Sequence, residues 1–262
     1  MHARHLVPNA VTLANITFGF LSIVASAQGR FQHACYLVFF AALCDMLDGR
    51  LARMLNATSK FGMELDSLSD AISFGVAPAF LVYLSSLKDL GAAGLAISVL
   101  FTLCGVLRLA RFNVTTSELS KFTFLGCPIP AAAGYLLSMV MVRESMPLWL
   151  VAFGTTFVGL SMVSTIKVPK FGSKGGPLPG VMLWIAAPTF IALLARPSAL
   201  TWHLWNGWNL VMLATNYVQL YRLGHIGHRH AVPVAAGAAA LAPGSAAAGG
   251  EEDRGLAQTL EK

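Results

Sequence analysis

The sequence predicts an all-α fold, a polytopic bundle of transmembrane helices, from two observations. Of the 262 residues, 56% are hydrophobic and only 11% are charged, roughly half the charged fraction of a soluble domain. The hydrophobic residues are also grouped in runs long enough to cross the roughly 30 Å apolar core of a bilayer. The net charge is +6, but the basic residues recur between these runs and form no dense patch. This distribution favours a membrane over nucleic acid as the partner.

Eight apolar segments are candidate spans, and we expect between six and eight of them to cross the membrane. The first follows Pro8 and Asn9 and lacks a clear signal-peptide cleavage site, so it is expected to remain as a span. Aspartates interrupt the second and third segments. The fourth ends in an arginine-containing run, the fifth is short and begins among prolines, and the last three contain no Asp, Glu, Lys or Arg. In chain order they are residues 11–27, 33–55, 66–87, 90–112, 128–142, 147–165, 179–195 and 200–221.

The distribution of lysine and arginine predicts that both termini are cytoplasmic. With eight spans and the N-terminus inside, the opposite side holds only four of the 18 basic residues, namely Arg30, Lys88, Arg143 and Arg196. Short loops rich in Lys and Arg stay in the cytoplasm. We therefore expect a transmembrane domain over residues 1–225. Residues 226–262 are rich in Ala and Gly and are expected to form a disordered cytoplasmic tail.

Four aspartates interrupt the second and third segments, in the run DMLDGRLARMLNATSKFGMELDSLSD of residues 45–70. A carboxylate at mid-membrane costs on the order of 2.5–3.5 kcal/mol. Asp45 and Asp48 are three residues apart and Asp66 and Asp70 are four apart, so each pair shares one helix face. Two adjacent antiparallel helices can therefore bring all four together, where cations or protons must offset their repulsion. Oxygen ligands without His or Cys select Mg²⁺ or Mn²⁺, and four suit a two-metal site for phosphoryl transfer.

The residues between the aspartates fit the binding of phosphate. Glycine in a helix costs about 1 kcal/mol relative to alanine, so Gly49 and Gly62 suggest that another group approaches the backbone closely. Ala52 keeps the same face shallow, and Arg53 can donate two parallel hydrogen bonds to phosphate oxygens. Ser59 lies in the connecting turn, either as a further donor or as an ordinary helix cap.

At these residues the chain resembles the CDP-alcohol phosphatidyltransferase family. It matches the family signature D-x2-D-G-x2-A-R-x8-G-x3-D-x3-D at every fixed position. The resemblance implies an integral membrane enzyme that moves a phosphatidyl group from a CDP-activated lipid to an alcohol, with the four aspartates as metal ligands. It also implies contacts with the nucleotide-lipid at Gly49, Arg53 and Ser59, and a proton acceptor at Asp70. A homodimer is common in this family, although no residue pattern in the chain indicates one.

Three further stretches resemble the phosphatidylserine synthase branch of bacteria and archaea. They are LVPNAVTLANITFG near the N-terminus, LRLARFN at residues 107–113 and FTFLGCPIPAAA at residues 122–133, with Cys127 where that branch usually has leucine. The resemblance covers most of residues 7–175. It implies CDP-diacylglycerol and L-serine as substrates, a bacterial cell membrane as the location, and an active site that faces the cytoplasm.

Five residues outside the signature are further candidates for substrate binding, each with an alternative. Arg108 and Arg111 share a helix face and could hold the serine carboxylate or the lipid diphosphate, unless they anchor the helix at the membrane interface. Asn113 is either a ligand or a helix cap. The resemblance implies that Asn9 and Thr12 touch the cytidine, although Asn9 could equally cap a helix.

Other functions are weighed against this one. The same chemistry could use glycerol 3-phosphate, an inositol compound or choline, although a phosphorylated acceptor should need a denser basic pocket. A cation transporter could also hold intramembrane aspartates, but the sequence shows no internal repeat of the kind that transporters often contain. Arg50 and Arg53 alone cannot balance four carboxylates, which disfavours a metal-free ionic network. Metal-dependent release of CMP distinguishes the enzyme from the transporter.

Overall fold

The structure, a computed structural model, describes residues 3–115, 123–164 and 167–169 and scattered positions between 191 and 207. All of these residues belong to one compact unit of the chain, Met1–Ile226. The predicted spans 179–195 and 200–221 lie outside the described residues except for the scattered positions. The predicted tail 226–262 lies wholly outside them.

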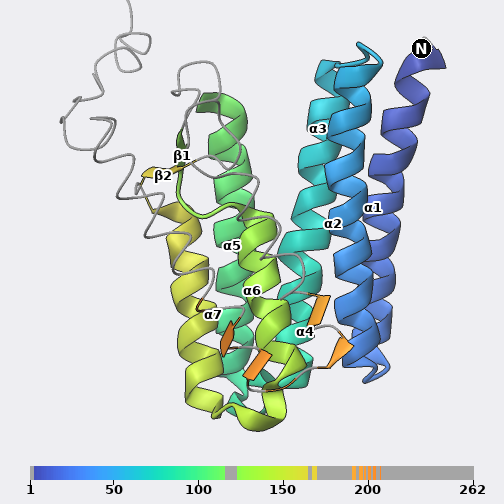
Figure 1. Cartoon of the computed structure of the whole chain (residues 1–262). Coiled ribbons are helices and arrows are strands. Elements are labelled where there is room, and N and C mark those ends of the chain that lie inside the picture. The colour runs from blue at the N-terminus through green and yellow to red at the C-terminus, as the bar shows by residue number, and fades with distance from the viewer. Residues whose placement is uncertain are drawn as a thin grey trace, which may run out of the picture. The chain divides into compact units, whose positions relative to one another are not determined.

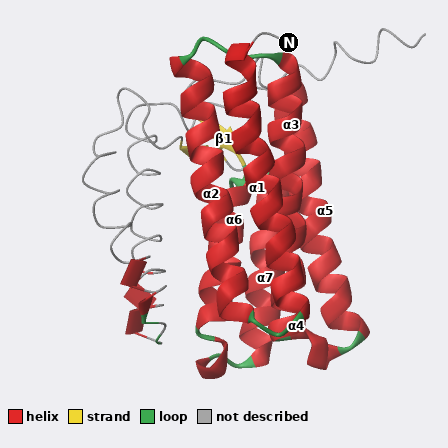
Figure 2. Ribbon diagram, turned by 90° about the vertical axis from the view of Figure 1, so that its right-hand side faces the viewer, coloured by secondary structure: helices red, strands yellow, loops and turns green. Residues whose placement is uncertain are grey.

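Helices make up nearly all of the described chain and lie side by side along a common direction (Figures 1 and 2). In chain order the elements are α1 (Ala3–Ala27), α2 (Phe31–Met54), α3 (Lys60–Asp70), the π-helical turn η1 (Ala71–Val76), α4 (Ala77–Ser85), the 3₁₀ turn η2 (Leu87–Leu90), α5 (Ala92–Thr115), β1 (Thr123–Leu125), α6 (Ile129–Met141), the 3₁₀ turn η3 (Arg143–Ser145), α7 (Leu148–Val163) and β2 (Lys167–Pro169). The predicted all-α class is confirmed for the described residues, apart from the short antiparallel pair that β1 forms with β2.

Three helical segments of the described chain are long and apolar enough to cross a membrane: His5–Ala27, Lys60–Ser85 and Ala92–Val114. The 26 residues of the second segment extend about 39 Å, which exceeds the roughly 30 Å apolar core of a bilayer. Helix α2 has 24 residues, but its aspartates and arginines lower its hydropathy. These features fit a membrane protein, whereas the number of about eight spans and the location of the termini remain predictions.

The third predicted span is one helix from α3 to α4, interrupted by η1. Sequence reasoning placed its start at residue 66, but the helix begins at Lys60, because Ser59 caps it. The π-helical turn ends two residues before Pro78, which has no N–H to donate to the carbonyl of the preceding turn. Such turns occur where the α-helical hydrogen bonding is interrupted, and often at functional sites. Here the turn begins directly after Asp70.

A short connection holds α2 and α3 next to each other. Asn56 has a φ of 48°, which is the left-handed region that asparagine tolerates better than most residues. The Ala57 N–H donates to Ala52 O at 2.8 Å, and His5 Nδ1 of α1 lies 2.8 Å from Ala57 O. The connection therefore also fixes the start of α1 against the α2–α3 pair.

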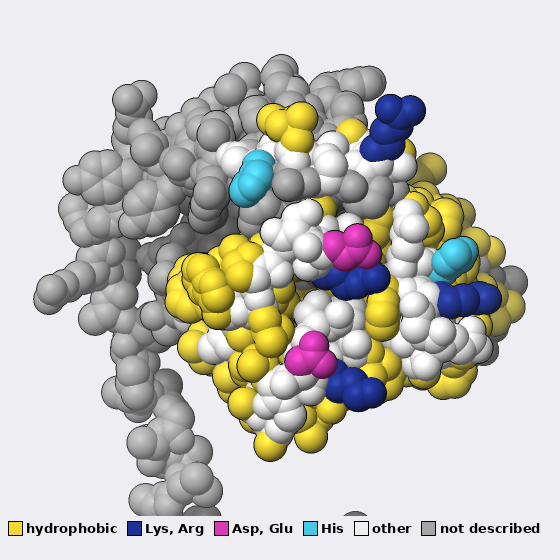
Figure 3. Space-filling view, turned by 90° about the horizontal axis from the view of Figure 1, so that it is seen from below, with side chains coloured by type: hydrophobic (Ala, Val, Ile, Leu, Met, Phe, Trp, Pro, Cys, Tyr) yellow, Lys and Arg dark blue, Asp and Glu magenta, His cyan; other side chains and the backbone are white. Residues whose placement is uncertain are grey.

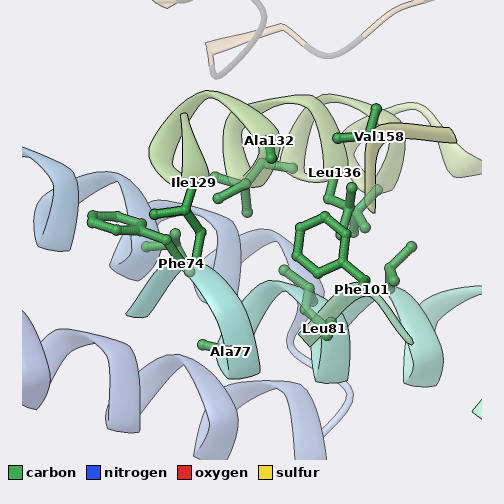
Figure 4. Close-up of a cluster of buried hydrophobic side chains, with 14 of the residues drawn as sticks. Phe74, Ala77, Leu81, Phe101, Ile129, Ala132, Leu136 and Val158 are labelled. Atoms are coloured by element: carbon green, nitrogen blue, oxygen red, sulfur yellow. The ribbon is translucent and has the colours of Figure 1, made fainter. Parts of the chain in front are cut away.

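The apolar core lies where η1 and α4 pack against α5 and α6, and where α7 packs against α5 and α6 (Figure 4). Its members are almost completely buried and include Phe74, Ala77, Leu81, Phe101, Ile129, Ala132, Leu136 and Val158. Gly159 lets α7 approach α5, because a Cβ there would lie 3.3 Å from Phe101 Cα. Within a membrane, close packing of this kind stabilises helix association through van der Waals contact. The core fixes η1 and thereby the helix that carries Asp66 and Asp70.

The end of the bundle formed by the α1–α2 turn, η2 and η3 carries charged side chains of both signs among apolar ones (Figure 3). The guanidinium of Arg143 lies 5.0 Å from the centre of the Phe31 ring and 3.6 Å from Glu144 Oε1. The aspartates of α2 and α3 lie away from this end, towards the α2–α3 connection.

Candidate active site

Aspartates from α2 and α3 converge between the two helices. One carboxylate oxygen each from Asp45, Asp48 and Asp66 lies within 4.8 Å of the other two. Asp45 is also within hydrogen-bonding contact of both Asp66 and Asp70. The two pairs, predicted from spacing to share a face on each helix, are therefore brought together across the α2–α3 pair.

No Lys or Arg in the described part of the chain forms an ion pair with these carboxylates within 4.0 Å. Among the described residues the one ion pair within 4.0 Å joins Arg143 to Glu144, so neither Arg50 nor Arg53 balances an aspartate there. Asp66 Oδ1 and Asp70 Oδ1 are buried and accept no hydrogen bond from a described residue. Leaving buried carboxylate oxygens without a donor or cation is costly. A set of ligands that are all oxygen atoms, some of them buried without a partner, suits a hard divalent cation such as Mg²⁺ or Mn²⁺.

Helix α1 contacts both aspartate-bearing helices through hydrogen bonds. The Thr12 hydroxyl lies 2.7 Å from Asp48 Oδ2 and 3.1 Å from Pro8 O. Both Thr12 and Asp48 are about 5% exposed or less. Thr12, which was predicted to contact the cytidine, is thus hydrogen-bonded to one of the carboxylates. Its contact with a nucleotide remains a prediction.

Gly49, Ala52 and Arg53 border open space on the last turns of α2. A Cβ added to Gly49 would meet only Arg53 Nη1, at 3.6 Å, so packing within the described chain does not demand a glycine there. Arg53 is exposed and Ala52 is half-buried. The face therefore leaves open space beside the carboxylates, and the binding of a substrate group there remains a prediction.

Ser59 and Gly62 have structural roles at the start of α3. The Gly62 N–H donates to Ser59 Oγ at 3.0 Å, so Ser59 is the helix cap that was one of its two predicted roles. A Cβ on Gly62 would lie 3.2 Å from Ser59 Oγ and 3.5 Å from Asn9 Oδ1. Asn9 lies inside α1, which begins at Ala3, so the alternative that Asn9 caps this helix is wrong.

The two arginines of α5 differ in their surroundings. Arg108 is 7% exposed, and its Nε has no hydrogen-bond partner among the described residues. It lies close enough to Asp70 for electrostatic attraction. Burial raises the pKa of the Cys127 thiol, and the nearby Arg108 guanidinium offsets only part of that rise. A neutral thiol therefore lies beside the arginine, and the guanidinium remains available to an anionic group.

Arg111 instead binds the end of α7. Its Nη1 donates to Val163 O at 2.8 Å, and its Nη2 donates to Met162 O at 3.2 Å and Ser164 O at 3.1 Å. A cation at a helix C-terminus satisfies carbonyls that lack partners and interacts favourably with the helix dipole. Arg111 thus holds α5 to α7, a role that spacing alone did not indicate.

Asn113 also makes an inter-helix contact and is not a cap, because α5 continues to Thr115. Its Nδ2 donates to Ser67 Oγ at 3.0 Å and lies 3.5 Å from Glu64 Oε2. Asn113 therefore joins α5 to the exposed side of α3, and its contact with substrate remains a prediction.

Three buried polar residues near the carboxylates were missed by sequence reasoning. Ser69 Oγ donates to Thr12 O at 3.3 Å and Ser73 Oγ donates to Asn15 O at 3.0 Å. Asn15 is fully buried, and neither of its side-chain polar atoms has a partner among the described residues. The available signal was the polar face at positions 12 and 15 of an otherwise apolar helix, matched by serines at 69 and 73.

Comparisons with known proteins agree with this geometry. Residues 5–166 match the family model of the CDP-alcohol phosphatidyltransferases. The CDP-diacylglycerol–serine O-phosphatidyltransferase of Helicobacter pylori is 40% identical over 173 residues, which cover 64% of this chain and 73% of that protein. The Bacillus subtilis protein of the same name is 37% identical over 165 residues, which cover 63% and 90%. The archaetidylserine synthase of Methanothermobacter thermautotrophicus is 40% identical over 171 residues, which cover 64% and 72%. Since the family model spans more than half of the chain, and the aspartate signature lies within the match, this chain belongs to the CDP-alcohol phosphatidyltransferase family.

Proposed function

We propose that the chain is a CDP-diacylglycerol–serine O-phosphatidyltransferase, which transfers the phosphatidyl group to the hydroxyl of L-serine and releases CMP. The observation that carries the proposal is the convergence of Asp45, Asp48 and Asp66 within 4.8 Å, with Asp70 beside them. Relatives at 37–40% identity bear the name of this activity or of its archaeal counterpart.

The four aspartates would hold the divalent metal on which the family generally depends. The residues fit such an ion, because the donor set is all oxygen and two buried carboxylate oxygens lack partners in the described chain. When bound, two Mg²⁺ or Mn²⁺ ions supply positive charge that stabilises the diphosphate and the leaving CMP.

The chain's own residues account for the remaining steps. The open face at Gly49 accepts the diphosphate, and the Arg53 guanidinium donates hydrogen bonds to it. Asp70 accepts the proton of the serine hydroxyl as general base. The serine oxygen attacks the β-phosphorus in line, so that a new P–O bond forms while the bond to the CMP oxygen breaks. Arg108 binds the serine carboxylate, since Arg111 donates to carbonyls of α7.

The active site would face the cytoplasm in a multi-pass protein of a bacterial inner membrane, with both termini inside and two copies in a homodimer. Charge supports the orientation. Arg50, Arg53, Lys60, Arg108 and Arg111 lie towards the end of the bundle that carries the carboxylates, and only Arg30, Lys88 and Arg143 lie towards the other end in the continuous described segments. Short basic loops are retained in the cytoplasm.

A panel of acceptors tests the function. Purified full-length protein in detergent is given CDP-diacylglycerol with L-serine, glycerol 3-phosphate, inositol 1-phosphate or choline, first with the metal chelated and then with Mg²⁺ or Mn²⁺ restored. We expect CMP and phosphatidylserine only with serine and metal. Product with another acceptor would assign that alcohol instead. No CMP with any acceptor would refute an enzyme and favour the transport of a cation.

A further inference from the structure

One face of α1 is polar where it meets α2 and α3. Thr12, Asn15 and Gly19 are spaced by three and four residues, so they share this face. All three are buried. Polar groups buried between helices in an otherwise apolar span need partners to offset their desolvation. In α1 the Thr12 hydroxyl and the carbonyls of Thr12 and Asn15 meet such partners on the two helices that carry the aspartates.

Thr12 connects the two aspartate-bearing helices. Its hydroxyl is 2.7 Å from Asp48 Oδ2 on α2, while its carbonyl accepts a hydrogen bond from Ser69 Oγ on α3 at 3.3 Å. Ser69 immediately precedes Asp70. A single residue of α1 thus contacts a carboxylate of the first pair and the neighbour of a carboxylate of the second pair.

A second connection lies one turn further along. Ser73 Oγ of η1 donates to Asn15 O at 3.0 Å. Gly19 allows this approach, since a Cβ there would lie 2.9 Å from Ser73 Cα. Helix α1 and the π-helical turn are therefore in close contact directly after Asp70 in the chain. Together with the Thr12–Ser69 hydrogen bond, this contact fixes the position of α3 along the axis of α1 at two adjacent turns.

We propose that α1 sets the spacing of the two carboxylate pairs, with Thr12, Ser69 and Ser73 as positioning residues for the metal site. The proposal rests on the proposed function, in that the carboxylates hold the metal. Carboxylates this close together repel one another whenever they are ionised and no cation is bound. The hydrogen bonds to α1 oppose the separation of α2 from α3 that this repulsion would cause, and they orient Asp48. Residues that hydrogen-bond to metal ligands have the same effect in other metal sites.

Metal affinity measured without turnover tests the proposal. Binding of Mn²⁺ to the full-length protein in detergent, without nucleotide, is followed by the EPR signal of the free ion. Thr12→Val removes the hydroxyl at nearly constant volume, and Thr12→Ser restores it. Ser22→Ala is the matched control, because Ser22 is fully buried and its Oγ also joins α1 to α2, at Ala34 O (3.0 Å), but far from the carboxylates.

We expect Thr12→Val to weaken Mn²⁺ binding by about 10- to 100-fold, the usual effect of losing an outer-shell partner. Ser69→Ala should weaken it less, and Thr12→Ser and Ser22→Ala should bind like the wild type. Because Thr12 acts through Asp48, adding Thr12→Val to Asp48→Asn should cause little further loss.

Unchanged affinity in folded Thr12→Val would overturn the proposal, and so would an equal loss in Ser22→Ala, which would reflect general loosening of the bundle. If Thr12→Val does not fold, Ser69→Ala decides in the same way. Wild-type protein that binds Mn²⁺ but releases no CMP with any acceptor would refute the proposed function alone. Wild-type protein that binds no Mn²⁺ would refute both.

Discussion

Replacing Gly19 by alanine is predicted to destabilise the bundle by separating α1 from η1. The added Cβ would lie 2.9 Å from Ser73 Cα and 3.0 Å from Ser73 Cβ, whereas carbon atoms pack best at roughly 3.5–4.0 Å. Rotation of the Ser73 side chain cannot relieve the contact with Cα, so the helices must move. Overpacking of this kind costs about 1–3 kcal/mol.

Two smaller effects modify that cost. Moving η1 away stretches the hydrogen bond from Ser73 Oγ to Asn15 O, which contributes about 1 kcal/mol. Alanine favours the helix over glycine by about 1 kcal/mol, which offsets this loss. The net destabilisation is therefore about 1–3 kcal/mol, the cost of the overlap itself.

Thermal unfolding in detergent measures the effect against a control at Gly134. No atom lies within 4 Å of a Cβ added to Gly134 in α6, so Gly134→Ala gains helix propensity without overlap. We expect Gly19→Ala to unfold several degrees below the wild type and Gly134→Ala to unfold at or above it. A Gly19→Ala variant as stable as the Gly134→Ala variant would refute the close contact between α1 and η1.

Four further predictions concern the candidate site and the arginines of α5. Gly49→Ala should keep the melting temperature or raise it, because the methyl meets only Arg53 Nη1 at 3.6 Å, while activity at limiting CDP-diacylglycerol falls; unchanged activity would mean that no substrate group lies there. Asp70→Asn should abolish CMP release without unfolding the protein, and full activity in that variant would remove Asp70 as the base. Arg108→Gln should raise KM for L-serine by about 10- to 150-fold, the equivalent of one lost charged hydrogen bond. Arg111→Gln should instead lower the melting temperature and leave that KM unchanged, so equal KM effects at the two arginines would contradict their division of roles.

The spacing of the aspartates was enough to predict their convergence. Positions three and four residues apart define a helix face whatever the rest of the fold, and a short connection makes α2 and α3 neighbours. The same reasoning reached its limit at Arg108 and Arg111. They also share a face, but only the position of α7 shows that Arg111 meets helix-terminal carbonyls. The spacing of residues along a helix identifies which of them share a face. Which group that face contacts depends on how the helices pack.

Residues close to the backbone of another helix were harder to predict. Ser69 and Ser73 look like ordinary small polar residues, and their role depends on carbonyls of α1 that any sequence would provide. The pairing of β1 with β2 likewise arises from backbone groups, and these short segments contain no hydrophobic pattern that predicts strands. Pro78 indicates an irregular helix, but it does not distinguish a kink from a π-helical turn.

The turn at Ala71–Val76 has a consequence for the phase of the helix that contains it. In a regular α-helix each residue advances about 100° around the axis. A π-helical turn absorbs one extra residue, so the aspartate-bearing half before it and the core-packing half after it can each face their own partners. Loss of one residue inside this turn would leave both halves in phase, whereas loss of one residue elsewhere in the Lys60–Ser85 helix would rotate either the carboxylates or Leu81 away from its neighbours.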